Sequence, residues 1–243
     1  MSPQLIVSLV IFLAVFTQSM AGFGSALVAM ALLPAVIGLQ VATPLVALMM
    51  TTIEIFLLIR YRESINFRAV LPLIASAFVG IPLGVVFLTR LDETAMLALL
   101  GLVIAGYAVY ALLKEFNERI CLPEMAHPAW AYFIGLIAGM LGGAYNTFGP
   151  PVIIYGNCRR WGTTVFKSNL QAFFVVTSLA ATLGHAWNGG LTPEVWHYYL
   201  WSIPAMAVGI VSGISLDRFI QPEAFRRIVL VLLVIMGVRL GLA

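Results

Sequence analysis

Long apolar segments separated by short polar ones make up almost the whole chain. An apolar run of about 20 residues is long enough to cross the hydrocarbon core of a bilayer as a helix. Six segments are predicted to be full membrane spans, at residues 41–59, 69–88, 94–113, 165–186, 194–216 and 225–242. Four shorter apolar segments, at residues 5–20, 26–39, 129–141 and 152–158, are each too short for a comfortable span.

The short segments come in pairs, and each pair is divided by residues that disfavour a helix. The second pair is divided by residues 142–151, where glycines and two prolines surround Tyr145, Asn146 and Thr147. Proline lacks an N–H and glycine lowers the cost of leaving the helix, so two half-helices are predicted to meet there. Gly22-Phe23-Gly24 divides the first pair in the same way. Such breaks inside a membrane line a protein-enclosed or water-filled cavity, which makes both candidate binding sites.

The two halves of the chain resemble each other beyond the breaks. Phe23-Gly24 aligns with Phe148-Gly149, and Gly80-Ile81-Pro82-Leu83-Gly84 aligns with Gly209-Ile210-Val211-Ser212-Gly213. We therefore predict an all-α polytopic membrane protein with one membrane domain, residues 1–243. Repeat one covers residues 1–113, a cytoplasmic connector covers 114–128, and repeat two covers 129–243, each repeat being a glycine-broken hairpin plus three transmembrane helices.

The basic residues predict how these segments are oriented. Arginines and lysines gather in the loops at residues 60–68, 159–167 and 218–227, which the positive-inside rule places in the cytoplasm. Both hairpins then enter and leave the membrane on one side, and each repeat has an odd number of crossings. The repeats are consequently predicted to be inverted, with the two hairpin tips approaching each other near the midplane.

Composition agrees with this fold class. Of the 243 residues, 62% are hydrophobic and only 9% are charged, which excludes a soluble globular domain. The net charge of +3 reflects the cytoplasmic loops, and no basic patch with interleaved aromatic residues indicates nucleic-acid binding. Cys121 and Cys158 are too few for a disulfide framework. Ser19-Met20-Ala21 has the pattern of a signal-peptidase site, but we expect the segment to be retained because repeat two has the same design.

Several motifs are similar to those of the TauE/SafE family of sulfite exporters. They are Gly22-Phe23-Gly24 with Pro34, Gly135-x-x-x-Gly139 before Gly142-Gly143, Gly149-Pro150-Pro151, and Pro222-Glu223-x-Phe225-Arg226-Arg227. The resemblance covers nearly the whole chain and implies a transporter, by expectation an exporter, of sulfite, sulfoacetate or other small sulfonates in the bacterial inner membrane. Ser25, Tyr145, Asn146 and Thr147 replace glycines common in the family, which leaves the exact substrate open.

The predicted breaks suit an anion on physical grounds. Half-helices that begin after Gly24 and after Gly149 would point N–H groups and positive dipole ends at the site. The predicted substrate-binding residues are Gln18, Ser19, Gly22, Phe23, Gly24, Ser25, Tyr145, Asn146, Thr147, Phe148, Gly149, Asn169 and Gln171. The alternative is that the polar members only hydrogen-bond the broken backbone itself.

Glu54 is the only carboxylate well inside a predicted span, which makes it a candidate for proton coupling. The alternative is a structural pair with Arg60.

Other functions are less consistent with the sequence. There is no HExxH motif, no pair of intramembrane aspartates and no Cys–His group, so an enzyme is not expected. There is no P-loop, and no cofactor or resident metal is predicted. A passive anion channel, or a permease for small carboxylates or metal ions, stays open as an alternative. The expected partners are a small anionic substrate and the lipid bilayer, without nucleic acid. The oligomeric state stays open, a homodimer included.

Overall fold

The computed structural model describes residues 2–61, 64–90, 92–116, 125–216 and 222–242, and within these ranges the regular structure is entirely α-helical. Most of the predicted connector, residues 114–128, and Cys121 lie outside the described residues. The helices are α1 (Pro3–Ala21), α2 (Ser25–Leu32), α3 (Pro34–Ile37), α4 (Leu39–Tyr61), α5 (Phe67–Arg90), α6 (Glu93–Phe116), α7 (Ala129–Tyr145), α8 (Gly149–Cys158), α9 (Thr163–Trp187), α10 (Pro193–Leu216) and α11 (Pro222–Gly241).

Every predicted apolar segment is helical, and two of the segments differ notably from the prediction. The segment expected at 26–39 is two helices, because Pro34 starts α3 after α2 has ended at Leu32. The first leg is longer than predicted, since Pro3 starts α1 early and gives it 19 residues, about 28 Å at 1.5 Å per residue. Within the described residues, six helices are long and apolar enough to cross a membrane, namely α1, α4, α5, α6, α9 and α10.

α11 is not among these six helices, although residues 225–242 were predicted as a span. Arginines at 226, 227 and 239 restrict its uncharged part to residues 228–238. That length is well short of the roughly 20 residues that cross a bilayer, so a crossing here would require the arginines to extend to the interfaces.

The chain forms two compact units, which are described separately. Unit 1 comprises Met1–Val46, Leu91–Cys121 and Leu191–Ala243, and unit 2 comprises Ala47–Arg90 and Leu122–Gly190. Each unit combines segments from both predicted repeats. Unit 1 contains α1–α3 together with α6, α10 and α11, and unit 2 contains α5, α7, α8 and α9, while α4 passes from unit 1 into unit 2.

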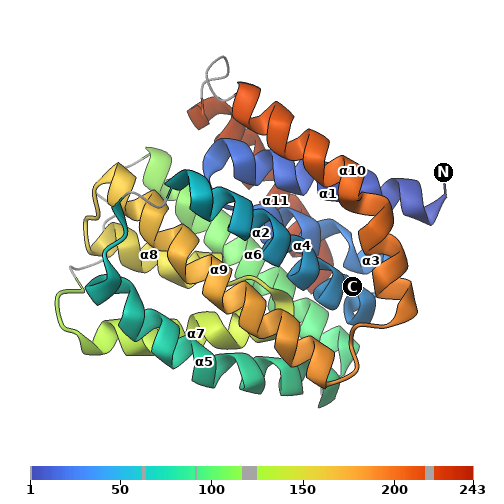
Figure 1. The fold of residues 1–243 in the computed structure, drawn as a ribbon, viewed down its shortest axis with the longest axis horizontal. Coiled ribbons are helices and arrows are strands. Elements are labelled where there is room, and N and C mark those ends of the chain that lie inside the picture. The colour runs from blue at the N-terminus through green and yellow to red at the C-terminus, as the bar shows by residue number, and fades with distance from the viewer. Residues whose placement is uncertain (1, 62–63, 91, 117–124, 217–221, 243) are drawn as a thin grey trace. The chain divides into compact units, whose positions relative to one another are not determined.

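In unit 2, α5 and α7 lie side by side along most of their length (Figure 1). A methyl group added at Gly80 would lie 2.8 Å from the Met140 nitrogen, and one at Gly139 would lie 2.7 Å from the Ala77 Cα. Small residues allow this backbone-to-backbone approach, as is common between membrane helices. The Gly80–Gly84 region therefore packs closely against α7.

In unit 1, α10 packs along α1 in the equivalent way (Figure 1). A methyl group at Gly209 would lie 3.1 Å from the Phe12 carbonyl oxygen, and one at Gly213 would lie 2.9 Å from that of Phe16. α6 and α11 form the other large contact of this unit, where Gly237 approaches the Ala105 nitrogen. The aligned glycine motifs of α5 and α10 thus both serve contacts with the first leg of a broken hairpin.

Candidate functional site at the helix breaks

The first break lies in unit 1 between α1 and α2 and depends on two glycines. Gly22 and Gly24 have φ angles of 81° and 106°, a region that residues with a side chain rarely adopt. The N–H of Gly22 closes α1 by donating to the Gln18 carbonyl at 2.7 Å. Gly22 is buried, while Phe23 and Gly24 are half-buried.

The polar side chains of this break largely serve its own backbone. The N–H of Ser25 donates to Oε1 of Gln18 at 3.2 Å, and the Ser25 hydroxyl donates to the same oxygen. Gln18 therefore ties the end of α1 to the first residue of α2. Ser19 is 2% exposed, and its hydroxyl oxygen has no hydrogen-bond partner among the residues described.

The second break lies in unit 2 between α7 and α8. Asn146 ends α7 with a φ of 56°, and its N–H donates to the Gly142 carbonyl at 2.7 Å. This is a left-handed C-cap, which asparagine tolerates better than other residues with a side chain. Thr147 makes one long hydrogen bond, from its hydroxyl to the Leu141 carbonyl at 3.4 Å. Tyr145, Asn146 and Thr147 are all buried.

The start of α8 is poorer in donors than predicted. Pro150 and Pro151 occupy positions directly after Gly149, and neither has an N–H. Of the first three helical residues, only Gly149 can donate from the backbone. The predicted anion-binding N-terminus is thus reduced, and donors for an anion at this break must come mainly from side chains and from the turn that precedes Gly149.

Phe148 connects the second break to α9 by packing against this helix. Its ring lies over Gly142, where an added methyl group would collide with it, and packs edge-on against Phe173 with centroids 6.3 Å apart. Gly149 faces Phe174. The aromatic ring is 1% exposed, so Phe148 has a packing role in addition to any contact with substrate.

Asn169 and Gln171 occupy the same helix as Phe173, just before it. Both are buried. Oδ1 of Asn169 accepts a hydrogen bond from the Asn66 N–H at 2.8 Å, while its Nδ2 has no partner among the described residues. The break and these two amides are thus held in one unit. Glu54, also in unit 2, is fully buried on α4; the side chain of Arg60, its suggested partner, lies outside the described ones.

Two structural features were not predicted from the sequence. The place of His185 beside Trp187, near the end of a predicted span, favours an interfacial role, but the side chain is 2% exposed and buried within unit 2. In unit 1, the Glu93 carboxylate accepts a hydrogen bond from the Leu39 N–H at 3.2 Å and so caps the start of α4. Because 54 positions separate these two residues, no local pattern could have indicated the cap.

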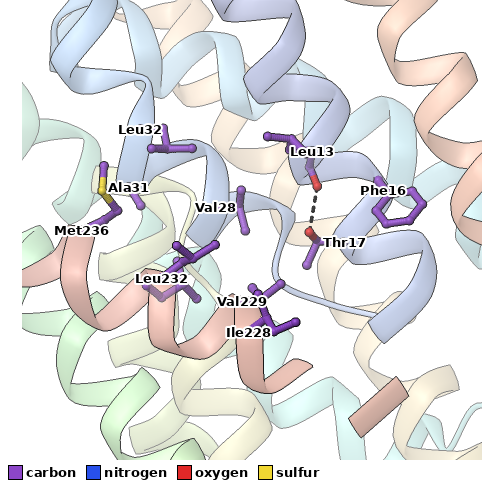
Figure 2. A pocket seen from close by; sticks show the side chains of 11 residues that line it. Leu13, Phe16, Thr17, Val28, Ala31, Leu32, Ile228, Val229, Leu232 and Met236 are labelled. Carbon is purple, nitrogen blue, oxygen red and sulfur yellow. Dashed lines mark hydrogen bonds between the residues drawn. The ribbon is translucent and has the colours of Figure 1, made fainter. Parts of the chain in front are cut away.

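A pocket in unit 1 adjoins the first break but is unsuited to an anion. It has a volume of about 250 Å³ and lies between α1, α2 and α11 (Figure 2). Its polar lining residue, Thr17, donates its hydroxyl to the Leu13 carbonyl at 2.8 Å. Its other walls are apolar, formed by Leu13, Phe16, Val28, Ala31, Leu32, Ile228, Val229, Leu232, Leu233 and Met236. The described residues contain no group of three or more His, Cys, Asp or Glu side chains that could hold a metal ion.

Comparison with known proteins identifies the family. The model of the sulfite exporter TauE/SafE family matches residues 7–240. The chain belongs to the TauE/SafE family. It is therefore a multi-pass membrane transporter of the plasma membrane and not an enzyme.

Two curated relatives of this family are similar to the chain. A probable sulfite/organosulfonate exporter, TauE, from Cupriavidus necator is 24% identical over 180 residues, covering 74% of this chain and 70% of the relative. A probable inner membrane transporter protein, TsaS, from Comamonas testosteroni is 26% identical over 180 residues, covering 73% of each. No solved structure gives a significant match.

Proposed function

We propose that this TauE/SafE protein exports small sulfur-containing anions, such as sulfite, sulfoacetate or other sulfonates. The observation that carries the proposal is the family match over nearly the entire chain, together with the function named for the Cupriavidus relative. The site residues are compatible with it, because both breaks place buried neutral hydrogen-bonding groups where a membrane helix is interrupted. A small anion can be held by such groups without a buried cation.

The two breaks have different roles in this proposal. At the second break, the Asn146 amide and the Thr147 hydroxyl are the principal donors to the anion, because the prolines of α8 remove backbone donors. To donate to the anion, the Thr147 hydroxyl gives up its long bond to the Leu141 carbonyl. Tyr145 flanks them, and Asn169 and Gln171 support them from α9. At the first break, Gln18 and Ser25 hold the backbone in shape. Gly22, Phe23 and Gly24 shape the turn itself.

Transport proceeds in this proposal by alternating access between two inverted repeats. The contacts within each unit support a repeat relationship. α5 of repeat one packs on α7 of repeat two, and the corresponding α10 of repeat two packs on α1 of repeat one. This reciprocal exchange of equivalent helices is what two related halves would produce. The inverted orientation itself depends on the distribution of basic loops in the sequence.

The test is ligand-induced thermal stabilisation of the purified protein, followed by transport in proteoliposomes. A ligand that binds only the folded state at about 100 times its Kd adds about 2.7 kcal/mol of stability. Sulfite, sulfoacetate, thiosulfate, taurine and acetate are compared. The informative variant is Asn146→Gly, which keeps a backbone suited to the left-handed turn while removing the amide. Asn188→Gly, at the exposed end of α9, is the matched control.

We expect stabilisation by at least one sulfur anion, lost in Asn146→Gly and kept in Asn188→Gly. Stabilisation by acetate alone would favour a carboxylate permease. Transport separates a carrier from a channel: a carrier shows counterflow of labelled anion against unlabelled anion, whereas a channel gives flux without counterflow. Stabilisation by cations alone would refute the anion site.

A further inference from the structure

A column of buried polar side chains runs along α9, one of the helices able to cross a membrane. Three of these side chains recur at intervals of seven residues, namely Gln171, Ser178 and His185. Thr182 lies one turn before His185, and all four side chains are at most 8% exposed. Residues at this spacing share one face of a helix. Leu179 and Leu183 on the other side are 48% and 62% exposed. A polar face turned toward the protein interior in a membrane helix is costly and marks a functional path.

α4 adds polar groups to this column, and two hydrogen bonds define how it runs. Thr51 and Thr182 share a bond of 2.9 Å, and Asn66, which follows the end of α4, donates its N–H to Asn169 at 2.8 Å. Residue numbers therefore rise along α4 as they fall along α9, so the two helices are antiparallel. Glu54 lies between these two connections, one turn after Thr51, and is fully buried. This register places Glu54 level with the turn of α9 that begins at Thr177.

His185 stands at one end of the column. Its Nε2 is buried without a hydrogen-bond partner among the described residues, while Trp187, two residues later, is 92% exposed. The imidazole is therefore close to the end of the buried segment but inside it. A neutral imidazole has one donor and one acceptor nitrogen, and hydroxyl groups such as those of Thr182 and Thr51 can likewise both accept and donate a hydrogen bond.

Acidic side chains are rare around the column. Within the described residues of unit 2, Glu54 is the only Asp or Glu. Besides α4, which the Thr51–Thr182 bond joins to α9, the helices with extensive contacts to α9 are α5, α7 and α8. The described ionisable side chains of α5, α7 and α8 are Arg68, Arg90, Tyr132, Tyr145, Tyr155 and Cys158. Further ionisable side chains are Lys167 of α9 itself, and Arg159 and Arg160, which directly follow α8 in the chain. A carboxylate that gains and loses a proton at this position has no described acidic neighbour to share the charge.

We propose that Glu54 and His185 form a proton path in unit 2 and that the proton is the coupling ion of transport; this inference rests on the proposed function. A carboxylate oxygen of Glu54 binds one proton in one part of the cycle and releases it in another. His185 passes the proton between the end of α9 and the Thr182–Thr51 hydroxyl pair. Membership of the family does not by itself specify a coupling ion.

Two assays on the same proteoliposomes test the path. Labelled sulfoacetate is used because its sulfonate and carboxylate remain ionised near neutral pH, so the substrate itself carries no proton. The first assay measures exchange of labelled for unlabelled sulfoacetate without a pH gradient. The second measures steady-state accumulation under a gradient of about one pH unit in either direction, where coupling to one proton changes the accumulation ratio about tenfold.

The variants are Glu54→Gln and His185→Gln, with Glu194→Gln and His197→Gln on the exposed surface of α10 as matched controls. We expect Glu54→Gln to retain exchange and to lose the effect of the gradient. His185→Gln should retain exchange and approach steady state more slowly. Both controls should behave like the native protein. Glu54→Asp serves as a second variant if Glu54→Gln does not fold, and it should keep a reduced response to the gradient.

Three results would refute the proton path. They are native accumulation that ignores the gradient although exchange occurs, a Glu54→Gln response equal to the native one, and loss of exchange in a well-folded Glu54→Gln variant. The first two leave the proposed function intact. If the native protein neither exchanges nor accumulates any of the sulfur anions, the proposed function and the proton path fail together.

Discussion

Thr51 of α4 and Thr182 of α9 share a hydrogen bond, with 2.9 Å between their hydroxyl oxygens. It joins two helices that are each apolar enough to cross a membrane. The Thr51 hydroxyl also donates to the Ala47 carbonyl of its own helix at 3.0 Å. The bond therefore belongs to a small network within unit 2 rather than to an isolated pair.

A double-mutant cycle with Thr51→Val and Thr182→Val measures this bond. Valine keeps the shape of threonine and removes the hydroxyl. Hydrogen bonds between membrane helices average about 0.6 kcal/mol, so we expect a coupling energy of about that size. Reversible unfolding in detergent micelles provides the four stabilities. Strictly additive single-mutant effects would contradict the bond.

Gly139→Ala should destabilise unit 2 strongly, because the new methyl group would lie 2.7 Å from the Ala77 Cα on the neighbouring helix. Overpacking against a backbone that cannot move aside costs about 1–3 kcal/mol. Gly106→Ala on α6 is the control, since nothing lies within 4 Å of a methyl group there. That substitution should be neutral or should stabilise by about 0.5–1 kcal/mol. Thermal melts in detergent compare the two, and equal melting temperatures would argue against the tight α5–α7 contact.

Asn146→Ala and Asn146→Gly separate the backbone role of this residue from its side-chain role. At a φ of 56°, alanine is strained by roughly 1–2 kcal/mol, whereas glycine is not. We expect Asn146→Ala to melt at a lower temperature than Asn146→Gly, with both losing stabilisation by the anion. A glycine variant that still responds fully to the anion would assign Asn146 to the turn alone.

Gln18→Met tests whether the first break is held by its own side chains. Methionine has a similar length but cannot accept the hydrogen bonds of the Ser25 N–H and hydroxyl. A buried donor left without a partner costs about 1–3 kcal/mol, so the melting temperature should fall. Gln4→Met, half-buried near the start of α1, controls for the substitution type and should change little. An unchanged melting temperature in Gln18→Met would remove the structural role assigned to this residue.

The helices were largely predictable because apolar length alone defines a membrane helix. The breaks were predictable for a related reason: glycine and proline act on the backbone locally, wherever they occur. The division of residues 26–39 into α2 and α3 was not predicted, although Pro34 was recognised, because sequence does not state whether a proline kinks a helix or ends it. The short uncharged length of α11 becomes clear only when the arginines on both sides of residues 228–238 are considered together.

The positions of the two helix breaks were predictable, whereas the binding of a substrate by the residues there stays a prediction. The polar residues predicted at both breaks are buried, as expected for a site. The Gln18–Ser25 bond could be anticipated only as one of two alternatives, since seven positions separate the partners. The burial of His185 could not be anticipated, because its place near a helix end says nothing about which helices surround it.

The prolines at the start of α8 have a consequence for how members of this family can differ. A phosphate or sulfonate held by a run of main-chain amides would be bound in nearly the same way whatever the neighbouring side chains were. With Pro150 and Pro151 removing two of those amides, the proposed site would depend for its affinity on the side chains of Tyr145, Asn146 and Thr147. Side chains at these positions can be exchanged without altering the prolines, provided that the residue at position 146 tolerates a φ of 56°, so selectivity can diverge between paralogues.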